Sequence, residues 1–303
     1  MIVRWGLEEL PGVLDDLGIE RTLLVAGPRW DALAIPAAHR WTEIPSDRIS
    51  VHREVDGILA VGGGSTIDTA KAASAASSLP LVSVPTTYSG AEWTEFFGVR
   101  TPDRRQVGGG RGARPAGIVY DPELTRDLSR ADSGGTAMNA LAHCVEALYP
   151  GDLDVARRGA VGIDRWLPRV LEDGADLEAR TGLLEAASDA GQALAQRGLF
   201  LAHAMAQAVG GAYGLSHGAM NAICLPPAMR FNAPVVPDAM SAVSVERVEE
   251  LARLAGFERL RDFGVPKSDL EELGERAAAR PGARANPRSA SAAEVAELYR
   301  SVW

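Results

Sequence analysis

The sequence predicts an α/β domain followed by an all-helical domain. Residues 57–85 show the pattern strand, glycine turn, helix and strand, and from Ser129 onward apolar residues recur at helical spacing. The chain has 303 residues and is 46% hydrophobic, which is enough for two cores. A parallel crossover unit needs helices on both faces of its sheet. We therefore expect residues 1–128 to form a domain with a parallel sheet and residues 129–303 to form a helical bundle.

The elements of the first domain follow from apolar periodicity and from the turn residues between the apolar runs. Prolines interrupt residues 28–45, so we expect only a short helix and a weak strand near residues 41–44 there. Residues 98–116 are rich in Gly, Arg and Pro, which indicates a long surface loop or an irregular hairpin. The remaining predicted elements are helices at residues 7–18 and 66–78 and strands at residues 21–27, 57–61, 81–85 and 118–120.

The second domain lacks β-rich runs. Its helical periodicity is interrupted by only one stretch that resembles a linker, residues 280–290. The predicted helices span residues 136–149, 155–172, 178–209, 218–232, 241–256, 268–279 and 291–302.

Composition excludes several classes of function. The net charge is −9 and no Lys/Arg cluster stands beside aromatic residues, so nucleic-acid binding is not expected. No apolar run reaches membrane-spanning length, and the N-terminus lacks a secretion signal, so we expect a cytoplasmic protein that does not bind membranes. Cys144 and Cys224 lie in apolar runs and are predicted to be buried thiols.

The turn Gly62-Gly63-Gly64-Ser65 joins a buried strand to a helix. Glycines there let the first N–H groups of the helix approach an anion closely, and the helix dipole favours negative charge, so a pyrophosphate fits. The alternative is a structural turn in which Asp68 and Lys71 form a surface pair. Thr86 and Thr87 follow the next strand, at the end where ligands gather in open α/β sheets; a threonine-rich strand end is the alternative.

Asn139 and His143 stand four residues apart, on one face of a helix, and His203 and His217 follow in later helical segments. Imidazoles and a side-chain carbonyl are ligands of divalent metals. Any one histidine in an apolar helix is more simply a core residue. Three of them without a common partner would be costly to bury, so together they predict a metal site.

These motifs resemble, in order and spacing, those of one known family. The glycine turn, Asp68, Lys71, Thr86, Thr87 and the Asn139 to Asn221 set are similar to the group III, iron-containing alcohol dehydrogenases over most of the chain. Residues 85–92, 119–122 and 138–149, together with Asn286-Pro287-Arg288 and Trp303, look most like the maleylacetate reductase branch.

The resemblance implies a dehydroquinate synthase-like fold, an NAD or NADP cofactor, a divalent metal (iron or zinc) in the cleft between the domains, and a homodimer. Carried over residue by residue, it implies that cofactor contacts come from Gly62, Gly63, Gly64, Ser65, Asp68, Thr86 and Thr87. It implies in the same way that the metal ligands are Asn139, His143, His203 and His217, and that the three histidines form the catalytic centre.

Three departures from the family pattern concern the chemistry. Asn139 stands where the family usually has aspartate, and a neutral amide holds a metal less tightly, so a metal-free enzyme is an open alternative. Gln207 replaces a histidine that helps to relay a proton, and glutamine is neither an acid nor a base near neutral pH. The connection between Pro45 and Asp56 is short for a crossover helix. The function that this departure affects is cofactor binding, because the connection belongs to the domain that is expected to hold the cofactor.

The turn after the first predicted strand bears on which nicotinamide cofactor is used. NAD-preferring relatives place an acidic residue there, whereas this chain has Ala26-Gly27-Pro28-Arg29. Without a carboxylate a 2′-phosphate is not repelled, and Arg29 is available to pair with it, so we predict that NADP is accepted.

The sequence therefore predicts an NAD(P)-dependent oxidoreductase that acts on a small-molecule substrate, similar to maleylacetate reductase. It is expected to interconvert a secondary alcohol and a ketone, or to reduce an enone. Two alternatives stay open. One is a tailoring dehydrogenase of specialised metabolism, acting on a hydroxylated peptide or a β-hydroxy acid whose ketone then loses CO₂. The other is a non-catalytic pseudoenzyme subunit, which would bind neither metal nor nicotinamide.

Overall fold

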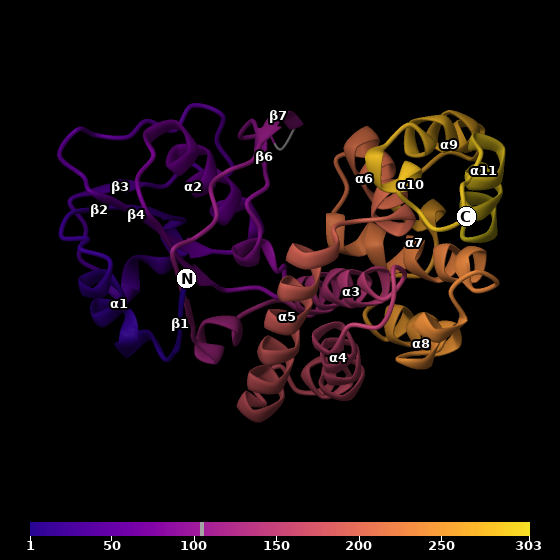
Figure 1. Ribbon diagram of the computed structural model, residues 1–303, viewed down its shortest axis with the longest axis horizontal. Coiled ribbons are helices and arrows are strands. Elements are labelled where there is room, and N and C mark those ends of the chain that lie inside the picture. The colour runs from indigo at the N-terminus through magenta and orange to yellow at the C-terminus, as the bar shows by residue number, and fades with distance from the viewer. Residues whose placement is uncertain (104–105) are drawn as a thin grey trace. The chain divides into compact units, whose positions relative to one another are not determined.

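The chain divides after Arg126. In the computed structural model, which describes residues 1–103 and 106–303, Met1–Arg126 form an α/β unit and Asp127–Trp303 form a helical unit (Figure 1). This confirms the predicted fold class, a parallel α/β domain followed by a helical domain.

The first unit is built on a six-stranded sheet in which every paired strand is parallel. The spatial order is β1-β8-β5-β4-β2-β3, so the carboxyl ends of β2, β4 and β5 lie side by side. The strands are β1 (Ile2–Trp5), β2 (Thr22–Ala26), β3 (His39–Trp41), β4 (Gly57–Gly62), β5 (Leu81–Pro85) and β8 (Gly117–Tyr120).

The two faces of the sheet are covered by different helices. Side chains alternate along a strand, so Leu24 of β2 packs on the face that carries α1 (Leu10–Asp16), whereas Val25 packs on the face that carries α2 (Gly64–Ser77). Burial of the central strands on both faces explains their nearly continuous apolar sequence.

Two features of the first unit differ from the sequence prediction, and a third concerns the connection that the sequence showed to be short for a helix. Strand β1 was not predicted, because its half-exposed residues show no apolar alternation; pairing with β8 makes it a strand. The weak edge strand lies at His39–Trp41 rather than at residues 41–44. No helix forms between β3 and β4, so residues 42–56 return to the sheet as coil.

Residues 98–116 contain the irregular hairpin that was one of the two predicted forms. Strands β6 (Phe97–Arg100) and β7 (Gln106–Gly110) pair antiparallel, with a shift of register at Val99 and Arg100. Residues 104 and 105, in the same predicted stretch, lie outside the described residues.

The second unit packs its helices around α3, whose residues from Ser133 onward are almost all buried. A helix that is apolar or small on every side belongs in the centre of a bundle, and α4, α5 and α7 surround this one. The helices are α3 (Arg130–Ala147), α4 (Asp154–Glu172), α5 (Leu177–Arg197), α6 (Leu201–Tyr213), α7 (His217–Asn232), α8 (Val245–Leu254), α9 (Leu270–Ala278), α10 (Pro281–Arg284) and α11 (Ala292–Ser301).

Two predictions for this unit were wrong. The expected single helix at residues 178–209 is two helices, because Gly198 at φ +78° ends α5 and redirects the chain before α6. Residues 280–290 are not a linker. They contain the short helix α10, and Asn286 exchanges side-chain hydrogen bonds with Asn232 of α7 at 2.7 and 3.0 Å.

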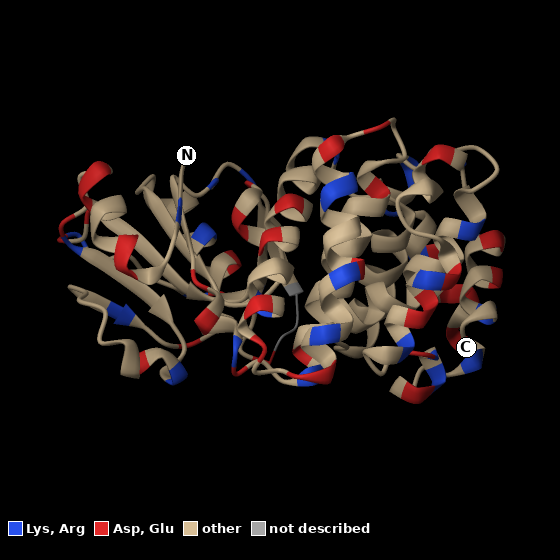
Figure 2. Ribbon diagram, turned by 90° about the horizontal axis from the view of Figure 1, so that it is seen from below, with Lys and Arg blue, Asp and Glu red and all other residues tan. Residues whose placement is uncertain are grey.

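Charged residues of both signs are interspersed along the helices, whereas β2, β4 and β5 carry none (Figure 2). In the part of the chain that the structure describes, no helix is both long and apolar enough to cross a membrane. Cys144 and Cys224 are free and buried, as predicted.

Candidate functional site

The glycine turn at the carboxyl end of β4 packs directly against the loop after β5. A Cβ atom on Gly63 would lie 2.8 Å from Thr87 Cγ2, and one on Gly64 would lie 3.3 Å from Ser89 Oγ. Real Cβ atoms do not approach other atoms as closely as the first of these distances. The glycines are therefore needed for the turn and the threonine loop to meet.

The first turn of α2 has no side-chain cap. Its N-cap residue is Gly63, and the N-terminal N–H groups of a helix have no acceptor within the helix itself. Beside them, the buried Thr87 Oγ1 has no hydrogen-bond partner. A backbone cradle kept open by glycine, with the positive end of a 14-residue helix and an unused hydroxyl, fits the diphosphate of a nicotinamide cofactor.

Asp68 and Ser65 lie in this same first part of α2. The Asp68 carboxylate accepts a hydrogen bond from the Gly98 backbone N–H at 3.1 Å, and burial raises the pKa of this carboxyl. Asp68 thus ties α2 to strand β6. Ser65 is partly exposed, and its carbonyl accepts a hydrogen bond from the Thr69 hydroxyl at 2.8 Å.

Lys71 is buried, so the surface pair with Asp68 that formed part of the structural-turn alternative was wrong. Its side chain is fully buried, and Nζ donates to the Ala91 carbonyl at 2.5 Å, Thr94 Oγ1 at 2.9 Å and the Phe96 carbonyl at 2.9 Å. Burial lowers the pKa of Lys71 to about 8. One buried ammonium group therefore anchors the middle of α2 to the segment that follows the threonine loop.

Thr86 and Arg29 connect the ends of β5 and β2. Thr86 is buried, and its N–H donates to the Gly62 carbonyl at 3.1 Å. The Arg29 guanidinium stacks over the Trp30 ring at 4.2 Å and donates to Thr86 Oγ1 at 3.4 Å. Arg29 thus stands at the same sheet edge as the glycine turn.

In the second unit the three predicted ligand histidines are neighbours. The ring centroids of His143 and His203 are 4.8 Å apart with nearly parallel planes, and those of His203 and His217 are 5.7 Å apart. They come from α3, α6 and the first residue of α7. Burial, and the nearness of the other two rings, hold the pKa of His143 well below its usual value, so its imidazole is neutral.

Glu146 is a functional residue that the sequence reasoning missed. It lies on α3, one turn after His143, and is fully buried. Its carboxylate accepts hydrogen bonds from the backbone N–H groups of Phe200 (2.8 Å) and Ala202 (2.8 Å) and from His203 Nδ1 (2.7 Å). Glu146 therefore caps α6 and fixes the proton of His203 on Nδ1. The available signal was a lone glutamate in the apolar run around His143.

Asn139 and His217 are joined through Asn221. The Asn221 amide nitrogen donates to Asn139 Oδ1 at 2.7 Å and lies 3.1 Å from His217 Nε2, while the buried Asn221 Oδ1 has no partner. Asn221 is one helical turn after His217 on α7. The structure thus brings all four predicted ligands into one group and adds an amide that the prediction did not include.

Backbone contact between α3 and α7 sets the spacing of this group. A Cβ atom on Gly218 would lie 2.3 Å from the Gly135 carbonyl oxygen, so no side chain fits between the two helices there. Gly218 directly follows His217, and Gly135 is one turn before Asn139. The contact fixes how far the His217 backbone stands from that of Asn139.

The types of donor atom in this group suit a divalent metal. His203 Nε2 and His143 Nδ1 are buried nitrogens without hydrogen-bond partners, and neutral imidazoles with an amide oxygen suit zinc or ferrous iron. Histidines that bind metals usually donate their other N–H to a carboxylate, which is what His203 does with Glu146. His143 and His203 lie nearly parallel, so one of these rings has to turn before both point to one ion.

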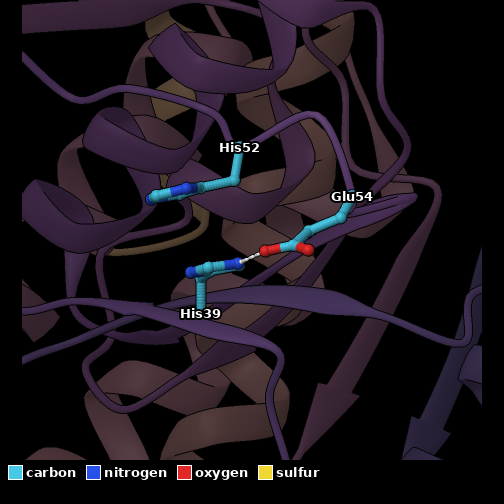
Figure 3. A group of neighbouring side chains, drawn as sticks. All are labelled: His39, His52 and Glu54. Atoms are coloured by element: carbon cyan, nitrogen blue, oxygen red, sulfur yellow. Dashed lines mark hydrogen bonds and ion pairs between the residues drawn. The ribbon is translucent and has the colours of Figure 1, made fainter.

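His39, His52 and Glu54, in the first unit, form a second group of ligand-type side chains (Figure 3). Neither histidine was assigned a role from the sequence. The two rings stack at 3.7 Å, and His39 Nε2 contacts the Glu54 carboxylate, which lowers the pKa of Glu54. His39 pairs with Leu23 at the amino half of β2, away from the glycine turn. Each member is partly or fully exposed, so the group holds residues 42–56 against the edge strand without needing a ligand.

Known proteins match this chain in both the α/β unit and the helical unit. The family model for iron-containing alcohol dehydrogenases matches residues 48–122, and the model for the C-terminal part of the Fe-containing alcohol dehydrogenase family matches residues 134–303. The maleylacetate reductase of Pseudomonas knackmussii is 32% identical over 89% of this chain and 86% of its own, and that of Rhodococcus opacus is 32% identical over 91% and 80%.

Solved structures show the same fold over the whole chain. An iron-containing alcohol dehydrogenase from Corynebacterium glutamicum superposes with a TM-score of 0.88 at 26% identity, covering 100% of this chain and 94% of its own. Maleylacetate reductase from a Rhizobium species gives 0.87 at 26% identity, with coverages of 100% and 95%. The chain therefore belongs to the iron-containing alcohol dehydrogenase family, in its maleylacetate reductase branch.

Proposed function

We propose that this chain reduces an unsaturated oxo acid of the maleylacetate type, with NADH or NADPH as hydride donor. Membership of the family makes the chain an NAD(P)-dependent oxidoreductase, and its relatives at 31–33% identity carry the name maleylacetate reductase. The observation that supports the reaction most is the group of neighbouring rings His143, His203 and His217, of which the first two are buried, and in which Glu146 leaves His203 Nε2 without a partner among the described residues. Neither the pseudoenzyme nor the tailoring dehydrogenase explains that arrangement better.

The reaction requires one group of residues that binds the cofactor and a second group that binds the metal. A bound reduced nicotinamide would supply a hydride from C4 to the alkene carbon β to the oxo group, a proton would add to the α carbon, and the cofactor would be left as NAD(P)⁺. In the first unit the uncapped N–H groups of α2 hold the cofactor diphosphate. Thr86 and Thr87 line the path of the cofactor from the diphosphate toward the nicotinamide. Ser65 and Asp68 belong to the same proposed cofactor site.

In the second unit Asn139, His143, His203 and His217 are the proposed metal ligands. A divalent ion bound there supplies a Lewis acid for the oxo group of the substrate. Glu146 keeps the proton of His203 on Nδ1, which leaves Nε2 as the donor atom. Gln207 has no titratable proton, so the proton that completes the reduction comes from water or from another side chain.

The test is to mix the purified protein with maleylacetate and either NADH or NADPH. We expect oxidation of the cofactor and a product heavier by two hydrogens in mass spectrometry. The His203→Ala variant should lose most of this activity while still binding the cofactor. If the wild-type protein binds the cofactor but leaves maleylacetate unchanged, the substrate assignment is wrong. If it binds neither nicotinamide, the pseudoenzyme alternative is favoured.

Two further expectations rest on the resemblance alone and stay predictions: the homodimer and the location in the cytoplasm. Light scattering on the purified protein measures the first, and fractionation of the source cells measures the second.

A further inference from the structure

Arg280 is a partly buried cation that has no anionic partner among the described residues. It is the N-cap residue of the short helix α10, and its guanidinium makes two hydrogen bonds, both to Gln207. Nη1 donates to Gln207 Oε1 at 3.0 Å and Nη2 donates to the Gln207 carbonyl at 3.2 Å. Both acceptors are neutral.

The remaining donors of Arg280 are unused. A guanidinium has five N–H groups, and two of them are bound to Gln207. The Nε–H is buried and meets no acceptor on any residue that the structure describes. Desolvation by burial lowers the pKa of this arginine, which means that burial makes its charged form less favourable.

Arg280 is connected to the helix that carries His203 through its contact with Gln207. Gln207 is four residues after His203 on α6, and Cβ atoms at that separation on a helix are about 6 Å apart. At the other end of the contact, a Cβ atom on Gly282 would lie 2.7 Å from the Phe200 carbonyl oxygen. The segment from Arg280 to Gly282 thus lies along α6, from the residue before its start to the turn after His203.

We propose that Arg280 binds a carboxylate of the substrate, with Gln207 holding the guanidinium in place. This inference rests on the function proposed above and names the residue that binds the carboxylate of its oxo acid substrate. A carboxylate accepts two parallel N–H groups from one guanidinium, and the unused donors of Arg280 match that need. A substrate whose oxo group lies at the histidines and whose carboxylate lies one helical turn away then spans His203 to Gln207.

Gln207 gains a role from this arrangement. At the position where the family often has a proton-relay histidine, its amide oxygen orients an arginine instead. The same helical position thus serves substrate binding in this chain. We infer that Gln207 is a positioning residue, acting through Arg280.

The test compares kinetics with maleylacetate and with its dimethyl ester, which keeps the reactive atoms and loses both charges. Arg280→Gln should raise KM for the acid by about 10- to 100-fold, the worth of a hydrogen bond between charged groups, and should change kcat less. The same variant should leave kcat/KM for the diester unchanged. Arg280→Lys should retain part of the affinity for the acid, because the charge remains and the planar fork is lost.

Arg284→Gln is the matched control, since Arg284 is an exposed arginine on the same short helix. It should behave as wild type with both substrates. If Arg280→Gln affects acid and diester equally, Arg280 only holds α10 on α6 and the inference is wrong. It is also wrong if the variant affects neither substrate.

A second measurement separates this inference from the proposed reaction. Adipate, a dicarboxylate that cannot be reduced here, should raise the melting temperature of the wild type and not that of Arg280→Gln. If maleylacetate is not turned over but this difference is seen, the carboxylate site stands and the reaction fails. If maleylacetate is reduced but adipate stabilises both proteins equally, the reaction stands and the carboxylate site fails.

Discussion

The amide nitrogen of Asn221 lies 2.7 Å from the side-chain oxygen of Asn139, across the interface of α7 and α3. One neutral amide thus donates to the residue that stands where the family usually has a charged metal ligand. This contact satisfies Asn139 within the protein, and a metal has to compete for the same oxygen.

We predict that Asn139→Asp binds a divalent metal more tightly than the wild type. A carboxylate supplies a formal charge to the ion and still accepts the hydrogen bond from Asn221. Changes at or next to metal ligands typically alter affinity by about 10- to 100-fold, and we expect a gain in that range. Competition with a chromophoric zinc chelator measures it. Equal or weaker zinc affinity in the variant would show that Asn139 is not a ligand.

We predict that Glu146→Gln lowers the free energy of unfolding by about 2–5 kcal/mol, since an amide cannot accept from all the donors that the carboxylate serves. At least two of the N–H groups of Phe200, Ala202 and His203 then lose an acceptor in a fully buried place. Urea unfolding measures the change. Glu185→Gln, an exposed glutamate on α5, should differ from wild type by less than about 0.5 kcal/mol. A loss no larger than that of the control would contradict the capping role.

Lys71 should give the stability of the first unit a distinctive dependence on pH. Its pKa is about 8 when folded and 10.5 when free, so between these values the unfolded chain binds a proton that the folded chain has released. Unfolding then takes up a proton, and raising the pH makes unfolding less favourable. At about 1.4 kcal/mol per pKa unit, the wild type should gain about 2–3 kcal/mol relative to Lys71→Met from below pH 8 to pH 10.

Urea titrations at several pH values measure this difference, and Lys267→Met, at an exposed lysine, is the control. Near neutral pH, Lys71→Met should itself be destabilised, because the carbonyls of Ala91 and Phe96 lose their donor. A difference between wild type and Lys71→Met that stays constant with pH would mean that Lys71 keeps its proton throughout.

Gly63→Ala should weaken binding of NADH and NADPH without changing metal content. Its new methyl group would lie 2.8 Å from Thr87 Cγ2, so the turn and the threonine loop have to move apart. We expect a loss of about tenfold or more in affinity, which corresponds to about 1.4 kcal/mol of displaced contact. Adding Thr87→Ser removes the clashing Cγ2 and should recover part of the affinity. Fluorescence titration of the reduced cofactors checks both variants. Failure of the double variant to recover would show that crowding against Thr87 Cγ2 is not the cause of the loss.

Arg29→Asp should shift cofactor preference from NADPH toward NADH. A 2′-phosphate near the end of β2 would lose a cationic partner and meet a carboxylate, whereas the ribose hydroxyls of NADH gain an acceptor. We expect the ratio of kcat/KM for NADPH over NADH to fall by about tenfold or more. A wild-type enzyme that already prefers NADH strongly would refute the role of Arg29.

Much of the fold was predictable because its signals are local. The glycine turn between an apolar strand and a small-residue helix identifies the parallel unit, and the histidine spacing places three rings that the structure does bring together. Strand β1 and the break at Gly198 were not predictable from periodicity. The first exists only through pairing with β8, and the second is one residue in a run that is helical on both sides.

The same reason explains why Glu146 and Asn221 were not predicted as site residues. Glu146 and Asn221 act through partners 54 and 82 residues away in the chain, and nothing in their own neighbourhoods states which group they meet. Lys71 looked like an exposed residue because charged side chains usually are, and only the close approach of residues 91–96 buries it. Sequence spacing predicts which face a residue occupies, but not what stands opposite that face.

Where Gly135 and Gly218 touch, two helices meet as bare main chain, and this has a consequence for how the enzyme can diverge. Because main chain contacts main chain there, a side chain on Gly218 would force the two helices apart, and the bare contact keeps the donors on both helices at one separation. A donor side chain can then be replaced by another, for example aspartate by asparagine, while the backbone that carries it stays in place. In such a scaffold a new activity can arise when the donor side chains change while the two helices keep their positions.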